Sequence, residues 1–152
     1  MSMVYWASYK GTHAGLAGVA NRGIRRATSS PYSHTELCIG NPFEGVVSCL
    51  SASGVDHGVR RKDMQLNPDK WDILELPWAD ANDVSRRFAA IQGHPYDFWG
   101  TSRFAAPLIA PVRQHPTAWF CTEACLFMLG LVPNEEWRLD PAGGHALVVQ
   151  SN

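Results

Sequence analysis

The chain has 152 residues, of which 45% are hydrophobic and 18% charged, and this length and composition fit one folded domain over residues 1–152. Its 13 basic and 14 acidic side chains nearly cancel, which excludes the strongly basic surface of a nucleic-acid-binding protein. No apolar run reaches the roughly 18 residues of a membrane span, and the first residues lack the features of a signal peptide, so we expect a cytoplasmic protein without a membrane span.

The first half of the chain carries the signals of β-strands. Polar and apolar residues alternate in several short runs bounded by glycine, proline or asparagine, which is typical of strands. A helix over Ala14–Ala27, weakened by three glycines, is predicted after the first strand. The second and third strands are expected to form an antiparallel hairpin. The predicted strands are Val4–Tyr9, His34–Ile39, Val46–Ser51, Gly58–Lys62 and Trp71–Leu76.

The second half carries the signals of helices. Asp80 is placed to cap a helix that Gly93 ends, and apolar residues recur between them at helical spacing. A short helix is predicted around Tyr96–Phe104, and a firmer one over Cys121–Leu129, closed by Gly130.

The end of the chain looks less regular. Pro141, Gly143 and Gly144 disfavour regular structure, so the tail from Pro133 onward is predicted to be irregular. Strands flanked by helices on both sides indicate an α+β fold.

Cys121 stands where a helix is predicted to begin, and this position favours a reactive thiol. The positive end of the helix dipole lowers the pKa of a thiol, and the thiolate is the nucleophilic form. Most free cysteines are instead small buried residues, which is what we expect of Cys38 and Cys49. Cys125, one turn after Cys121, is expected to pack against the sheet. In a reducing cytoplasm all four are predicted to be free thiols.

His34 is the candidate base. It lies two residues before Glu36 on a predicted strand, so both side chains leave the same face, and a carboxylate there can orient the imidazole. The alternatives are that both are surface residues, or that Ser51 or Ser53 on the next strand orients His34. The five remaining histidines are expected to have surface roles, namely His13, His57, His94, His115 and His145.

Four short motifs together resemble a known family. They are Tyr32-Ser33-His34-Thr35-Glu36-Leu37, then Ser51-Ala52-Ser53 with Gly58-Val59-Arg60, then Gly93-His94-Pro95-Tyr96-Asp97, then Phe120-Cys121-Thr122-Glu123-Ala124. In order and spacing they resemble the circularly permuted branch of the NlpC-type papain-like hydrolases, which includes YiiX-like proteins and is related to lecithin:retinol acyltransferase. As in that branch, the histidine strand precedes the cysteine helix. Similar small proteins occur in phages and prophages, which implies a phage or prophage origin.

The resemblance implies a permuted papain-like fold, with an antiparallel sheet packed against the helix that bears the nucleophile. By position it makes Cys121 the nucleophile and His34 the base. It also implies that Tyr96 lies near the oxyanion, where a phenol is a suitable donor. The family usually takes its third polar residue from the strand after the histidine, and here that strand offers only serines. A segment over residues 101–116 also separates Tyr96 from Cys121 more widely than in unpermuted relatives.

Three other functions compete with a hydrolase. His34-Thr35-Glu36 followed by two cysteines partly matches a zinc-dependent nucleobase deaminase, but Cys121 and Cys125 are one residue too far apart and no proline precedes them. An acyltransferase would use the same Cys121 and His34 with a different acceptor. A non-catalytic binding module would not need the cysteine.

The sequence therefore predicts a cysteine-nucleophile hydrolase with Cys121, His34 and Glu36 as catalytic residues and Tyr96 at the oxyanion site. The expected mechanism requires no metal and no cofactor. A peptide, a peptidoglycan peptide or an acyl lipid is the expected substrate class. The sequence specifies neither the bond cleaved nor the oligomeric state.

Overall fold

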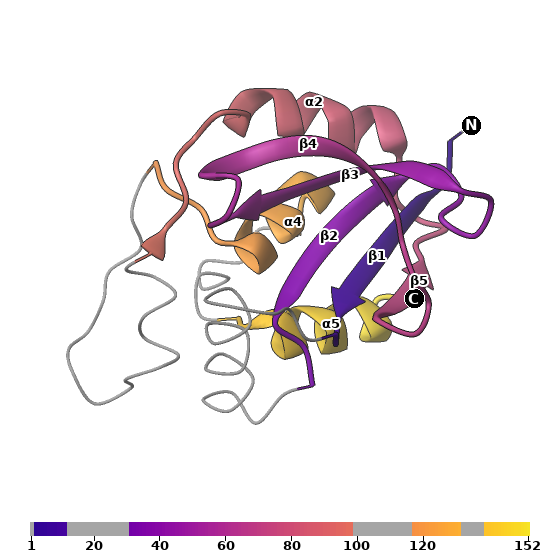
Figure 1. Cartoon of the computed structure of the whole chain (residues 1–152). Coiled ribbons are helices and arrows are strands. Elements are labelled where there is room, and N and C mark those ends of the chain that lie inside the picture. The colour runs from indigo at the N-terminus through magenta and orange to yellow at the C-terminus, as the bar shows by residue number, and fades with distance from the viewer. Residues whose placement is uncertain (1, 12–30, 99–116, 132–138) are drawn as a thin grey trace.

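The computed structural model describes residues 2–11, 31–98, 117–131 and 139–152, and a five-stranded sheet lies at its centre (Figure 1). The strand order is β4-β3-β2-β1-β5, and every neighbouring pair is antiparallel. This arrangement confirms the predicted antiparallel sheet and the α+β class. The strands are β1 (Val4–Tyr9), β2 (His34–Ile39), β3 (Val46–Ser53), β4 (Gly58–Gln65) and β5 (Trp71–Glu75).

Both faces of the sheet are apolar. Alternate residues of the central strand β1 point to opposite faces, so Val4 and Trp6 join the main core with the helices, while Tyr5 and Ala7 join a smaller cluster on the other face. All six residues of β1 are buried. The smaller cluster also contains Cys38, which confirms its predicted burial.

Two helices form where the sequence predicted them. α2 (Ala81–Ile91) begins at Asp80, whose carboxylate accepts hydrogen bonds from two backbone amides of the first turn, and it buries Val84, Phe88 and Ile91 against the core. α4 (Cys121–Leu129) ends at Gly130, which has the left-handed conformation with φ of 72°. Eight of the nine residues of α4 are buried, so this helix is a central element of the core.

The tail contains a helix that the sequence analysis did not predict. α5 (Pro141–Gln150) occupies a stretch expected to be irregular, so that prediction was wrong for these residues. Asp140 caps the helix by accepting from the Gly143 amide, and Pro141 takes the first turn, where its missing N–H costs nothing. Capping and burial of Val148 against the core outweigh the low helix propensity of the glycines.

Element boundaries account for the remaining differences. β4 runs three residues past its predicted end because it pairs with β3 along its whole length, from Val46↔Gln65 to Ser53↔Gly58. The helix predicted over residues 14–27 lies outside the described residues, as do residues 99–104 of the helix predicted from Tyr96. Tyr96 itself forms an isolated β-bridge. In the described part of the chain, no helix has the length and apolar character needed to cross a membrane.

Candidate active site

The strands β2 and β3 separate at one end, and the start of α4 lies at this strand fork. The ladder between them stops at Leu37↔Leu50. Beyond that pair the Ser51 hydroxyl donates to the Thr35 carbonyl at 2.5 Å, in place of a backbone hydrogen bond. The Cys125 sulfur lies 3.8 Å from the carbonyl oxygens of both Thr35 and Leu50, which confirms that Cys125 packs against the sheet. Because the two strands separate here, a side chain on α4 can reach the face of β2 that is turned away from α4.

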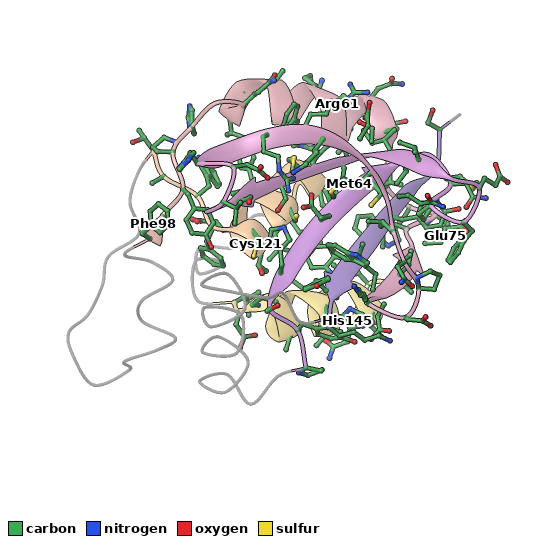
Figure 2. The ribbon with its side chains drawn as sticks, viewed as in Figure 1. Arg61, Met64, Glu75, Phe98, Cys121 and His145 are labelled. Atoms are coloured by element: carbon green, nitrogen blue, oxygen red, sulfur yellow. The ribbon has the colours of Figure 1, made fainter. Side chains whose placement is uncertain are left out.

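Cys121 and His34 meet at the strand fork. Their side chains lie close enough to shift each other's pKa, although they are far apart in the chain. Cys121 is the first residue of α4, as Figure 2 shows, and only 4% of it is exposed. The side chain of His34 is 23% exposed, so solvent reaches the imidazole but hardly the sulfur. The backbone amide of Thr35 is a further hydrogen-bond partner of the thiol.

Glu36 holds the other side of the imidazole. Its Oε1 lies 2.8 Å from Nε2 of His34, which leaves Nδ1 as the ring nitrogen available to Cys121. The two serines considered as alternatives have other partners, because Ser51 donates to the Thr35 carbonyl and Ser53 accepts from the Asp56 amide. Of these three candidates, Glu36 is therefore the one that contacts the imidazole. Glu36 is 1% exposed, so it is not a surface residue.

Arg60 on β4 completes the cluster, and no role was predicted for it from the sequence. Its Nη2 donates to Oε1 of Glu36 at 2.6 Å and its Nη1 donates to Oε2 at 2.7 Å. Its Nε donates to Asp56 at 2.9 Å. Strand register is the signal that could have identified Arg60. Arg60 lies opposite Ser51 in the β3–β4 ladder, on the sheet face that carries Glu36. A buried carboxylate requires a cation of this kind.

The contacts shift the pKa values of the cluster toward its charged forms. Burial pulls the pKa of His34 downward, but the hydrogen bonds to Cys121 and Glu36 outweigh burial and raise this pKa to about 10. Burial raises the pKa of the Cys121 thiol, but the hydrogen bond with His34 outweighs it and lowers this pKa below its usual value. Burial also raises the pKa of the Glu36 carboxyl, but the hydrogen bonds from Arg60 and His34 outweigh burial and lower this pKa below its usual value. These shifts favour a thiolate–imidazolium pair over the neutral thiol–imidazole pair.

A cavity of about 300 Å³ is connected to this cluster only through Trp71, and none of the four clustered residues lines it. The ring of Trp71 packs edge-on against His34 at a centroid distance of 6.4 Å and also lines the cavity. Tyr32, Asp72 and His145 form part of the same lining, and the Tyr32 hydroxyl donates to Asp72 at 2.6 Å. The cavity walls are therefore a mixture of aromatic, aliphatic and polar side chains.

The chain at Tyr96 runs beside the segment that leads into α4. Tyr96 forms a parallel bridge with Trp119, two residues before Cys121, and its ring packs edge-on against Phe98 at 4.9 Å between centroids. The fold thus brings Tyr96 close to the cysteine segment despite the long connection between them. A role for its hydroxyl at the oxyanion stays a prediction.

The other histidines differ in exposure. His57 is exposed, as expected, with φ of 63°. His94 and His145 are half-buried instead: Nδ1 of His94 accepts from the Trp119 indole at 3.0 Å, and Nδ1 of His145 lies 2.9 Å from the Ser8 hydroxyl. Two more histidines lie outside the described residues, at positions 13 and 115.

The other thiols have structural surroundings. Cys38 and Cys49 are directly opposite on β2 and β3 and fully buried, and their sulfurs are joined by a hydrogen bond at 3.5 Å, not by a disulfide. All four cysteines are free, as predicted. Among the residues that the structure describes, no group of three or more histidine, cysteine or acidic side chains is arranged to hold a metal ion.

Comparison with known proteins returned no match to a family model, a curated protein or a solved structure.

Proposed function

We propose that the chain is a cysteine hydrolase of the permuted papain-like type, which cleaves an amide, ester or thioester bond. One observation carries the proposal: a thiol at a helix start lies beside an imidazole, and a buried carboxylate holds the imidazole from its other side. This is the order of nucleophile, base and orienting group that covalent acyl transfer requires. Cys121, His34 and Glu36 supply the three groups.

In the proposed reaction the Cys121 thiolate attacks the carbonyl carbon of the substrate and forms a C–S bond. The backbone amide of Cys121, at the positive end of α4, is placed to stabilise the negative oxygen of the tetrahedral intermediate. The His34 imidazolium gives its proton to the departing amine, alcohol or thiol as that bond breaks. A water molecule then attacks the thioester, neutral His34 takes its proton, and the carboxylic acid leaves Cys121.

The position of the helix supports the papain-like part of the proposal. The resemblance implies an antiparallel sheet packed against the nucleophile helix, and α4 packs against β2, which bears the histidine, and β3. His34 precedes Cys121 in the chain, which matches the permuted order. The substrate class stays a proposal: a peptide, a peptidoglycan peptide or an acyl lipid.

The test is a comparison of cysteine variants. p-Nitrophenyl acetate serves as a general activated ester, and release of p-nitrophenol measures turnover. Cys121→Ala is expected to lower the rate by at least about 100-fold, since it removes the nucleophile. Cys38→Ala is the control, because that thiol is buried in the smaller cluster and pairs with Cys49. Equal loss in both variants, or none in either, would contradict the proposal.

An acyltransferase with the same residues differs only in the acceptor. Adding a primary alcohol or amine to the assay separates the two activities, because a hydrolase releases free acetate while a transferase forms the new ester or amide. Chromatography of the products distinguishes these outcomes.

A further inference from the structure

Glu36 lies between His34 and Arg60, and Arg60 makes more of its hydrogen bonds. Arg60 donates to both carboxylate oxygens, at 2.6 and 2.7 Å, whereas His34 contacts only Oε1, at 2.8 Å. The planar fork of a guanidinium fixes the plane of a carboxylate when both bonds form. The direction in which Oε1 points at the imidazole is therefore set by Arg60.

The charge of Glu36 also depends on Arg60. A carboxylate with 1% exposure is costly to bury unless a cation compensates it, and without one it takes up a proton. His34 cannot replace that cation, because its own positive charge depends on Glu36 and on the Cys121 thiolate. Arg60 is charged at all relevant pH values, so it is the permanent cation of the cluster.

Arg60 is itself held in place. Its side chain is 16% exposed, and its Nε donates to Asp56 at 2.9 Å while its two terminal nitrogens hold Glu36. Asp56 is held in turn, since its amide donates to the Ser53 hydroxyl at 3.3 Å in the turn between β3 and β4. The guanidinium is thus fixed from both sides by groups on the β3–β4 hairpin and β2.

We propose that Arg60 is a positioning residue of the site: it keeps Glu36 ionised and aligned on Nε2 of His34, so that Nδ1 of His34 faces the Cys121 thiol. This inference rests on the proposed function for its catalytic meaning. Its structural content, a coupling from Arg60 through Glu36 to His34, is measurable without any substrate.

The experiment replaces Arg60 by lysine and by methionine. Lysine keeps the charge but donates at a single point, and methionine removes both charge and donors. Arg61→Met is the matched control, because Arg61 is the exposed neighbour on the same strand (labelled in Figure 2). The first readout is the pKa of His34, which is measured by NMR titration of the histidine ring protons. The second is the pH profile of Cys121 alkylation by iodoacetamide, mapped by mass spectrometry.

Arg60→Met is expected to lower the pKa of His34 by about one unit or more, because Glu36 takes up a proton and the imidazolium loses its anion. The acid limb of Cys121 alkylation then moves to higher pH, with a loss of at least about 10-fold near pH 6 and little change where every thiol is ionised. Arg60→Lys is expected to lie between Arg60→Met and wild type. Arg61→Met is expected to match wild type in both readouts.

An unchanged His34 pKa in Arg60→Lys and Arg60→Met would overturn the inference. If the methionine variant does not fold, the lysine variant decides the question, because it retains the buried charge. Failure of the proposed function gives a different result: Cys121 of the wild-type protein would then be no more reactive than Cys38, whatever the His34 titration shows.

Discussion

Replacing Gly144 by alanine tests how closely α5 packs at the start of α4. A Cβ at position 144 would lie 2.4 Å from Cγ2 of Thr122 and 3.1 Å from the Trp6 ring. Both neighbours are fully buried and have no space to yield, so the cost lies near the upper end of the range for overpacking, about 3 kcal/mol. The higher helix propensity of alanine offsets about 1 kcal/mol. We expect a net loss of about 2 kcal/mol in the free energy of unfolding.

Gly143→Ala is the matched control in the same helix. Its Cβ would lie 3.1 Å from Cδ2 of Leu139, the end of a flexible side chain, and 3.3 Å from the Asp140 carboxylate. A small shift of Leu139 relieves the first contact, so this variant is expected to be neutral or to gain up to about 1 kcal/mol. Neighbouring substitutions of the same type are thus predicted to differ in sign.

Urea unfolding measures the two free energies, and thermal melts give a second estimate. For a chain of this size, a loss of about 2 kcal/mol in the free energy of unfolding lowers the midpoint of the thermal melt by about 4–8 °C. Thr122 is adjacent to Cys121, so displacement of the α4 start is also expected to slow alkylation of Cys121 in Gly144→Ala. If Gly144→Ala is as stable as Gly143→Ala, the close packing of α5 on Thr122 is refuted.

Alkylation of Cys121 is expected to stay fast below the pH at which ordinary thiols ionise, because its pKa is lowered; a rate that rises only through the usual thiol range would contradict this. Folding raises the pKa of His34 from 6.5 to about 10. The protonated His34 therefore contributes fully to the free energy of unfolding below pH 6.5, and this contribution is lost as the pH rises through about 10. Urea unfolding should therefore show falling stability toward pH 10, and less so in His34→Gln. Asp80→Ala removes the cap from the Asn82 and Asp83 amides and should cost about 1 kcal/mol in the same assay; no change would mean that water replaces the cap.

Local patterns predicted most of the elements because each pattern has a local physical cause. The alternation in His34–Ile39, the Asp80 cap of α2 and the glycine that ends α4 act within a few residues, and all three elements formed as expected. α5 was missed although Asp140 and Pro141 are local start signals, because the two glycines argue against a helix and the packing that suits a glycine, Gly144 against Trp6, is tertiary.

The sequence by itself determined that His34 and Glu36 share a strand face and that Cys121 begins a helix, because strand and helix periodicity fix these relations locally. Only the tertiary structure decided that the thiol meets the imidazole, since that contact depends on where β2 and β3 separate and on how α4 packs there. It also added Arg60, whose partnership with Glu36 follows from strand register and burial. Contacts between distant segments depend on the packing of the whole sheet, and no local pattern encodes that packing.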